Sequence, residues 1–303
     1  MNPKIHSSIQ SMRLRTLPLS LAGVCLGILL AAADYQVGWG TALLIMLTTV
    51  CLQILSNLSN ELGDVLHGTD TPDREGPGYG LNNGVLTVPD MKRLIVLFVL
   101  LCIGSGLAMI RVSFGTLFSL ESVCLMLLGA TAILGAMKYT LGRNPYGYRG
   151  LGDLYVFLFF GLVSVLGAYF VAVHTIPTAL LLLPAASIGC FSVGVLNVNN
   201  IRDMKTDAAN RVTVALKLGL KGARIYQTVL IGLGWLLMLA WCLCRFPDPW
   251  HYLFVITLPL YVKHLQGVWT RTGRALDPML PLLVLSTFLL SLLVGLGFLK
   301  FLL

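Results

Sequence analysis

Residues 57–80 carry the side chains best suited to chemistry, at a point where a long apolar run ends in a loop rich in Gly, Pro and Asp. Asn57, Asn60 and Asp64 are spaced i, i+3 and i+7, which places their side chains on one face of a helix. Asp70 follows in the loop. Because acidic and amide groups are costly at the end of a membrane helix, they indicate a functional site.

A second stretch with the same pattern follows at residues 197–207. Asn200, Asp203 and Asp207 again share one helix face at the end of an apolar run. Carboxylate and amide oxygens are the hard ligands that Mg²⁺ prefers, and a bound metal can in turn hold a polyanion such as a diphosphate. The predicted metal ligands are Asn60, Asp64, Asp70, Asn200, Asp203 and Asp207.

The segment from Lys138 to Asp153 holds three cations, three tyrosines and four glycines. Gly and Pro favour tight turns, so we expect this segment to form a compact lid. Its arginines can bind a phosphate or a carboxylate, and its tyrosine rings can face a cationic intermediate. Tyrosine is also common at membrane interfaces, so a single ring is weak evidence. The residues concerned are Lys138, Tyr139, Arg143, Tyr146, Tyr148 and Arg149.

More cations follow the second acidic stretch, at Arg211, Lys217, Lys221 and Arg224. They can reach a diphosphate or can act only as topology charges, and Lys217 is the favoured diphosphate partner because it follows the acidic stretch closely. His67 is interpreted as a loop histidine. The acids better explained as helix caps or partners of loop cations are Asp73, Glu75, Asp90 and Asp277.

The composition identifies a polytopic membrane protein, because 56% of the 303 residues are hydrophobic and only 11% are charged, against about 25% in soluble domains. Nine apolar runs approach the roughly 20 residues that cross a bilayer. The predicted spans are residues 16–33, 39–61, 94–112, 117–139, 153–173, 176–201, 223–244, 250–265 and 279–302. The seven cysteines lie in or beside these runs without a CxxC or Cys/His pattern, which argues against zinc and disulfides.

Positive charge gathers in alternate loops, which hold 18 of the 21 lysines and arginines. The positive-inside rule therefore places the amino terminus and the long loops in the cytoplasm. The second and sixth spans then both run inward, so the two acidic stretches reach the same face. Their equivalent positions, four spans apart, indicate a duplicated four-helix unit with a shared central site.

Three segments together resemble the UbiA superfamily of membrane prenyltransferases: NLSNELGD with a later Asp and GPGYG, then YTLGRNPYGYRGLGD, then LNVNNIRD with a later Asp. The resemblance covers nearly the whole chain and is strongest to the branch that prenylates 1,4-dihydroxy-2-naphthoate in menaquinone synthesis. Glu61 is a departure, because the family usually has Asp there, and the longer side chain keeps the charge but moves it.

The resemblance implies an all-α fold of nine transmembrane helices around a central cavity, as one integral membrane domain over residues 1–303. It implies Mg²⁺-dependent transfer of a polyprenyl chain from its diphosphate to 1,4-dihydroxy-2-naphthoate, with decarboxylation to demethylmenaquinol. The expected location is the bacterial cytoplasmic (inner) membrane, with the active-site loops on the cytoplasmic side, lipid around the protein and no nucleic-acid partner.

The predicted site divides into two groups. The predicted catalytic residues are Asp64, Asp203, Asp207, Arg143 and Tyr139. The predicted substrate-binding residues are Asn57, Asn60, Lys138, Arg143, Tyr146, Tyr148, Arg149, Asn200 and Lys217.

Two other functions compete with this prediction. One keeps the reaction and changes the acceptor to 4-hydroxybenzoate, a haem or a chlorophyllide. The other is a transporter of a cation or metabolite. Transporters place ionisable groups near the membrane midplane, whereas both acidic stretches here lie at one face beside basic loops, which disfavours transport.

Overall fold

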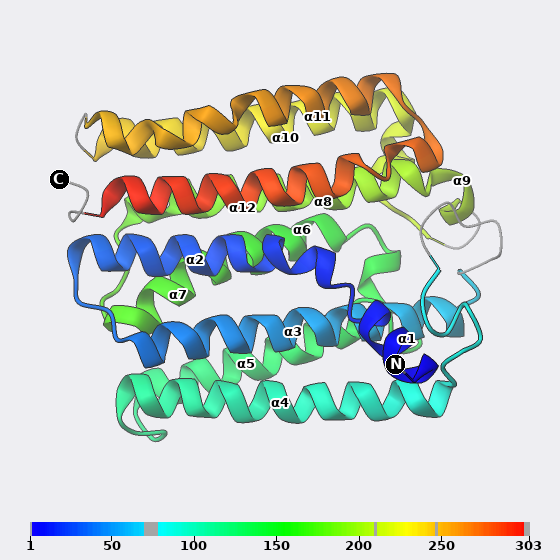
Figure 1. Ribbon diagram of the computed structural model, residues 1–303, viewed down its shortest axis with the longest axis horizontal. Helices are drawn as coiled ribbons and strands as arrows, with labels where there is room; N and C mark the ends of the chain where they lie inside the picture. Colours follow the sequence, from blue (N-terminus) through cyan, green and yellow to red (C-terminus); the bar gives the residue numbers. More distant parts are fainter. Residues whose placement is uncertain (1, 70–77, 209–210, 246–247, 300–303) are drawn as a thin grey trace.

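The computed structural model describes residues 2–69, 78–208, 211–245 and 248–299, which fold into a bundle of long helices (Figure 1). In this described part the only backbone pairing of the β type is an isolated bridge between Arg149 and Val212. The prediction of an all-α fold is therefore confirmed.

The helices follow the predicted spans closely. The α-helices are α1 (Pro3–Ser11), α2 (Leu17–Asp34), α3 (Trp39–Leu66), α4 (Val88–Phe114), α5 (Leu120–Lys138), α6 (Gly152–Val156), α7 (Ser164–Val173), α8 (Leu182–Arg202), α9 (Met204–Asp207), α10 (Val214–Cys244), α11 (Leu258–Thr270) and α12 (Met279–Phe298). The 3₁₀ segments are η1 (Leu14–Thr16), η2 (Tyr146–Tyr148), η4 (Ala179–Leu181), η5 (Pro249–Thr257) and η6 (Gly273–Leu276), and η3 (Phe157–Val163) is a π-helix.

Eight helical stretches of the described chain are long and apolar enough to cross a membrane: Pro3–Asp34, Trp39–Leu66, Val88–Phe114, Leu120–Lys138, Gly152–Val173, Ala179–Arg202, Val214–Cys244 and Gly273–Phe298. The remaining predicted span, residues 250–265, is formed by η5 and α11. These two segments run alongside α10 across the same width of the bundle (Figure 1). The predicted count of nine thus agrees approximately with the structure.

Several helices extend beyond the predicted spans, and in α3 and α10 the extension bears on the site. α3 continues past residue 61 to Leu66, so Asp64 is a helical residue. α10 begins at Val214 instead of residue 223, and Gly219 breaks its regular conformation with a positive φ of 66°. Glycine has no Cβ to clash in this conformation, which explains why the break occurs there.

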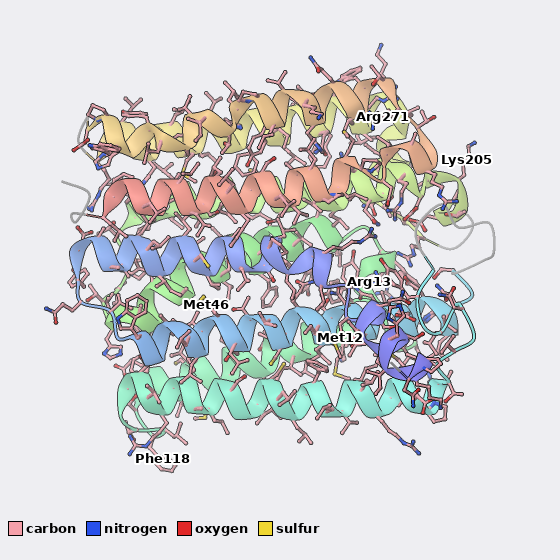
Figure 2. All side chains as sticks on the ribbon, viewed as in Figure 1. Met12, Arg13, Met46, Phe118, Lys205 and Arg271 are labelled. Carbon is pink, nitrogen blue, oxygen red and sulfur yellow. The ribbon has the colours of Figure 1, made fainter. Side chains whose placement is uncertain are left out.

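The apolar helix α2 lies inside the bundle, where it packs against α12, α7 and α3. α3 packs in turn on α4, and α8 packs on α10. Leu100 of α4 and Leu127 of α5 are among the exposed apolar side chains. Figure 2 shows side chains standing outward all along α4. An apolar exterior is expected where lipid is the solvent, so the chain is an integral membrane protein.

The end of the bundle that contains α1 and α9 also holds the ends of α3, α5 and α8 (Figure 1). The described parts of the long connections that the charge pattern assigns to one face therefore lie together. Asp90 there accepts hydrogen bonds from the backbone and hydroxyl of Thr87 at 3.2 and 2.8 Å and pairs with Lys4 at 2.9 Å. Its predicted role as a helix cap is confirmed.

Candidate active site

A cavity of about 460 Å³ lies between α2, α3, α5, η3 and α8. Its walls toward the distant end of the bundle are apolar, with Ile45, Leu125 and Val171 among them. Its other end, where α3 and α8 terminate, is polar. The polar and charged lining residues at that end include Arg13, Arg15, Asn57, Asn60, Asp64, Tyr79, Tyr139, Asn199, Asn200, Arg202 and Arg211.

The cavity wall contains a π-helix in its middle. η3 contributes Phe159, Phe160 and Val163 to the lining, and single π-helical turns are frequent at functional sites. Gly161 in η3 packs so closely on Gly189 of α8 that a Cβ at position 161 would lie 2.6 Å from the Gly189 Cα. This close packing sets how far η3 stands from α8.

Asp64 is the buried carboxylate of the first acidic stretch. Only 3% of it is exposed, and its Oδ1 accepts a hydrogen bond from the Tyr148 hydroxyl at 2.7 Å. The same oxygen pairs with Arg211. Thr69 donates to the backbone oxygen of Asp64 through both its amide and its hydroxyl, at 3.0 Å each, which fixes the end of α3.

Arg211 joins the two acidic stretches. Besides Asp64, its Nε lies 3.7 Å from Asp207 Oδ1, and its guanidinium carbon lies 4.5 Å from the ring centre of Tyr148. Burial alone would lower the pKa of Arg211, but the two carboxylates raise it, so the guanidinium stays charged. Burial and the nearby Asp64 charge raise the pKa of the Tyr148 phenol, which therefore stays a neutral donor.

Asp203 is held by the residue before it. Arg202 donates from Nε and Nη2 to the two oxygens of Asp203 at 2.8 and 2.7 Å, and from Nη1 to Asp277 at 2.7 Å. Arg15 lies 3.7 Å from the same Asp277. The predicted pairing of Asp277 with loop cations is confirmed, and it makes Arg202 a bridge between two carboxylates.

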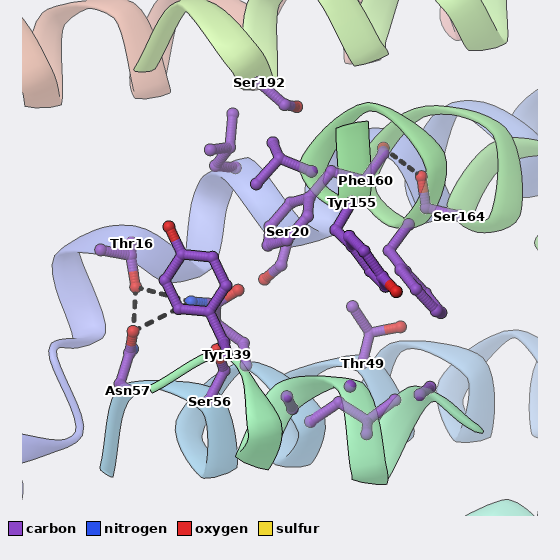
Figure 3. Close-up of a pocket in the computed structure, with 18 of the residues that line it drawn as sticks. Thr16, Ser20, Thr49, Ser56, Asn57, Tyr139, Tyr155, Phe160, Ser164 and Ser192 are labelled. Carbon is purple, nitrogen blue, oxygen red and sulfur yellow. Dashed lines mark hydrogen bonds between the residues drawn. The ribbon is translucent and has the colours of Figure 1, made fainter. Parts of the chain in front are cut away.

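The three predicted amides occupy different surroundings. Asn60 and Asn200 line the cavity, and Asn60 Oδ1 accepts from the Thr140 hydroxyl at 3.3 Å. Asn57 also lines the cavity but fastens the amino-terminal segment: it donates to Met12 O at 2.9 Å and to Thr16 Oγ1 at 3.0 Å. Figure 3 shows the contact with Thr16 beside the ring of Tyr139.

The predicted lid packs against the end of α3. Tyr139 and Tyr146 line the cavity, and the Tyr146 ring stacks on Tyr155 with centroids 4.0 Å apart. Burial raises the pKa of Tyr139 to about 12, so its ring is neutral at physiological pH. The lid is joined to the residues after α9, because the Val212 amide donates to Tyr148 O at 3.0 Å. The loop residue His67 contacts the backbone oxygens of Gly63 and Gly142.

The remaining predicted cations lie outside the cavity lining. Lys138, Arg143, Arg149 and Lys217 are exposed to solvent. The Nζ of Lys217 nevertheless approaches the turn at Gly150, 3.4 Å from where a Cβ would stand. The predicted ligand Asp70, with Asp73 and Glu75, lies outside the described residues.

Sequence reasoning gave no site role to three arginines that line the cavity, Arg13, Arg15 and Arg202. Arg13 and Arg15 stand directly before the first span in RLRTLPLSLAG, and that position was the available signal. Positive charge before a first span usually only sets the orientation of the protein in the membrane, so the sequence did not distinguish these arginines as site residues. Tyr155, within a predicted span, was likewise missed.

The donors at the polar end suit a hard cation in kind. Asn60, Asp64 and Asn200 line the same cavity, and the buried Asp203 and Asp207 pair with the lining residues Arg202 and Arg211. Among the described residues, no three His, Cys, Asp or Glu side chains come close enough together to form a metal cluster. Arginines neutralise the carboxylates instead, so metal binding requires these ion pairs to open.

Comparison with known proteins agrees with this architecture. Residues 20–292 match the UbiA prenyltransferase family. The chain belongs to this family. It is 40% identical over 292 residues to a protein of Escherichia coli (strain K12) named 1,4-dihydroxy-2-naphthoate octaprenyltransferase, which covers 95% of this chain and 94% of that protein. A protein of the same name from Haemophilus influenzae is 35% identical over 302 residues, 98% of this chain and 97% of that protein.

A solved UbiA structure shares the fold of this member of the family. The apo structure of a UbiA homolog from Aeropyrum pernix K1 superposes with a TM-score of 0.68 at 15% identity, over 95% of this chain and 96% of that one. A UbiA homolog from Archaeoglobus fulgidus, bound to GPP and Mg²⁺, gives 0.64 at 13% identity, over 96% and 98% of the two chains. As a UbiA family member, the protein is a membrane prenyltransferase.

Proposed function

We propose that this enzyme transfers a polyprenyl chain from its diphosphate to 1,4-dihydroxy-2-naphthoate, releases CO₂ and yields demethylmenaquinol. The observation that carries the proposal is one cavity with a charged end, where both acidic stretches meet, and an apolar end between membrane helices. Such a cavity suits a substrate with a diphosphate head and an isoprenoid tail. The names of the full-length relatives supply the acceptor.

The residues present fit Mg²⁺ as the cofactor, as in the A. fulgidus homolog. Asn60 and Asp64 would hold it from α3, and Asn200, Asp203 and Asp207 from α8 and α9, with Asp70 as a further predicted ligand. When bound, Mg²⁺ neutralises the diphosphate and stabilises it as a leaving group. Arg211 forms an ion pair with Asp64 in this structure. Opening of this pair would free an Asp64 oxygen to bind the metal and the Arg211 guanidinium to bind phosphate.

The aromatic residues of the lid would shield the reacting carbon. When the bond from the allylic carbon to the diphosphate breaks, positive charge develops beside Tyr139, Tyr146 and Tyr155, whose rings line the cavity. Aromatic faces attract cations, and burial keeps the Tyr139 phenol protonated, so it does not compete as a nucleophile. The apolar helix faces exclude water, which would otherwise capture the cation.

The acceptor chemistry needs little help from side-chain acids and bases. The ring carbon that bears the carboxylate attacks the allylic carbon, and the adjacent hydroxyl becomes a carbonyl as it loses its proton. The carbon–carbon bond to the carboxylate then breaks, CO₂ leaves with its bonding electrons retained by the ring, and the carbonyl oxygen regains a proton. No net proton is consumed, which accords with the mainly amide, arginine and tyrosine lining of the polar end.

The location and organisation of the site are part of this proposal. The charge pattern favours the cytoplasmic side for the end that contains α1 and α9, in the bacterial cytoplasmic membrane, with lipid around α4 and α5. Residues 1–303 would act as one domain, because helices from both halves of the chain line the same cavity.

The test uses purified protein in lipid nanodiscs with Mg²⁺, a polyprenyl diphosphate and the naphthoate labelled in its carboxyl carbon. We expect a prenylated product without label and an equal amount of labelled CO₂. A product that keeps the label, or reaction only with 4-hydroxybenzoate, would assign the chain to another acceptor. Diphosphate release that does not depend on an acceptor would contradict prenyl transfer itself.

A further inference from the structure

Arg13 has an unusual conformation and an unusual environment. It connects α1 to η1 with φ 50° and ψ 53°, a left-handed conformation that non-glycine residues seldom adopt. Its side chain lines the cavity, and its Nε and Nη2 atoms are buried without a hydrogen-bond partner among the described residues. Buried guanidinium groups normally have partners, so these two atoms point to a ligand that belongs in the cavity.

The backbone of Arg13 is fixed from both sides. The oxygen of Arg13 accepts hydrogen bonds from the amide and the hydroxyl of Thr16, both at 2.9 Å. Asn57 on α3 holds Thr16 Oγ1 and also the oxygen of Met12. A strained residue held this firmly is typical of a functional position, because the surroundings must maintain the conformation.

The charges of the cavity leave Arg13 without an acidic partner. Four arginines line the described cavity. Arg202 pairs with Asp203 and Asp277, Arg15 lies near Asp277, and Arg211 pairs with Asp64 and Asp207. In the described structure, Arg13 alone of the four forms no ion pair with a carboxylate; its guanidinium carbon instead lies 4.2 Å from the ring centre of Tyr79.

The two unpartnered atoms of Arg13 define the shape of the missing anion. Nε and Nη2 form one edge of the guanidinium plane, and this is the edge by which Arg202 holds both oxygens of Asp203, at 2.8 and 2.7 Å. Two parallel N–H groups match the two oxygens of a carboxylate. The pair of Arg202 and Asp203 therefore shows, within this protein, how a carboxylate binds the guanidinium edge that is unoccupied in Arg13.

We propose that Arg13 binds the carboxylate of the aromatic acceptor, as a positioning residue that sets which ring carbon faces the allylic carbon. This inference rests on the proposed function. The Tyr79 ring packs against the Arg13 guanidinium and accepts a 3.0 Å hydrogen bond from Arg15 through its hydroxyl. This contact keeps the guanidinium of Arg13 in place. The diphosphate is the other oxyanion in the reaction, but it needs a metal, and the acids that would hold metal stand beside Arg202 and Arg211, not beside Arg13.

The experiment compares wild type with Arg13→Gln, Arg13→Lys and the control Arg93→Gln, an exposed α4 residue whose side chain is 82% accessible. Binding is read without turnover, by fluorescence titration with 1-hydroxy-2-naphthoate, which keeps the carboxylate, and with 1-naphthol, which lacks it. We expect Arg13→Gln to weaken hydroxynaphthoate binding at least tenfold and naphthol binding less than twofold. Arg13→Lys should bind hydroxynaphthoate with intermediate affinity, because an ammonium group keeps the charge but lacks the two parallel N–H groups of the guanidinium.

Steady-state kinetics separate the two oxyanions. For Arg13→Gln we expect a tenfold or greater rise in the acceptor KM, a smaller change in kcat and an unchanged KM for the prenyl diphosphate. A rise confined to the prenyl diphosphate would assign Arg13 to the diphosphate, and equal hydroxynaphthoate binding in wild type and Arg13→Gln would remove the inference. If the wild type does not prenylate the naphthoate, the proposed function is wrong. That result is obtained from the wild type alone, so it is distinguished from a failure of the Arg13 assignment, which requires the variants.

Thermal unfolding temperatures measured in the same nanodiscs show whether a variant loses binding only because it is misfolded. We expect Arg13→Gln to unfold within a few degrees of Arg93→Gln, since Nε and Nη2 have no hydrogen-bond partner among the described residues and the contact that is lost is the one with the Tyr79 ring. A loss of acceptor binding that follows a general loss of stability, with naphthol binding lost equally, would count against a carboxylate site.

Discussion

The guanidinium of Arg211 donates to the carboxylate of Asp64, which lies 147 residues earlier in the chain. This ion pair joins the first acidic stretch, on α3, to the segment that follows the second one. Asp207 and the Tyr148 ring flank the same guanidinium. In the described structure Arg211 thus occupies a position where a divalent cation would satisfy the same oxygens.

Removal of Arg211 should change the metal requirement. In Arg211→Gln, Asp64 and Asp207 lose a competing positive charge, so we expect the Mg²⁺ concentration for half-maximal activity to fall severalfold. We also expect kcat to fall by about a hundredfold, since removal of one donor that stabilises developing negative charge commonly costs about 10²–10³ in kcat. Mg²⁺ titrations of initial rate measure both quantities.

The control for this experiment is Arg245→Gln, which removes an arginine paired with Asp34 at 2.7 Å at the opposite end of the bundle. Its Mg²⁺ dependence should match wild type. An unchanged or higher Mg²⁺ requirement in Arg211→Gln would show that Arg211 does not compete with metal.

Asp64 and Asp203 should both be essential. Each is 3% exposed and each is neutralised by arginine, so Asp64→Asn or Asp203→Asn leaves a buried guanidinium short of charge as well as removing a predicted metal ligand. We expect turnover to fall by at least a hundredfold in each variant, with the protein still inserted. Initial rates and size-exclusion profiles measure the two outcomes.

Asp90→Asn is the matched control, because it changes a carboxylate that caps α4 instead of facing the cavity. It should lower the unfolding temperature modestly and leave both KM values unchanged. Near-normal rates in Asp64→Asn or Asp203→Asn at ordinary Mg²⁺ would remove the model in which both stretches serve one site.

The exposed cations predicted to clamp the diphosphate allow a graded test. Arg143 and Lys217 lie outside the cavity lining, and exposed ion pairs contribute about 0–1 kcal/mol. We therefore expect Arg143→Ala and Lys217→Ala each to raise the KM for the prenyl diphosphate by less than about fivefold. A larger effect would show that the lid closes over the donor, and a rise only in the acceptor KM would assign them to the acceptor.

The sequence predicted the membrane spans and the two acidic stretches because both depend on local patterns. Apolar runs of the right length predict spans wherever the neighbours lie, and the helical spacing of Asn60 and Asp64 fixes a shared face. Asn200 likewise reaches the cavity as the pattern predicts. These features need only the sequence within one helix.

The partners of the charged groups could not be predicted from the sequence, because they depend on distances in the folded structure. Arg202 holds its own neighbour Asp203, and Arg211 holds Asp64 across 147 residues, yet both arginines resemble topology charges in sequence. Arg13 likewise stands in a basic head before the first span. Only the fold shows that its guanidinium turns into the cavity while its neighbours pair with acids.

Asn57 is predicted to act on the reaction through Arg13. Its amide donates to Met12 O and Thr16 Oγ1 and accepts from Gln53 Nε2 at 3.1 Å, which fixes the strained turn that carries Arg13. Loss of hydrogen bonds to buried groups costs about 1–3 kcal/mol. Asn57→Ala should therefore lower stability by about that amount and weaken acceptor binding, while leaving the KM for the prenyl diphosphate nearly unchanged.

A double-mutant cycle separates this indirect role from direct contact with substrate. If Asn57 works only by placing Arg13, the effects of Asn57→Ala and Arg13→Gln on hydroxynaphthoate binding will not add, because the second change removes a group that the first has already displaced. Asn60→Ala is the matched comparison one helical turn further along α3, and it should alter the Mg²⁺ dependence instead. Additive losses from Asn57→Ala and Arg13→Gln would show that Asn57 contacts the acceptor independently of the amino-terminal segment.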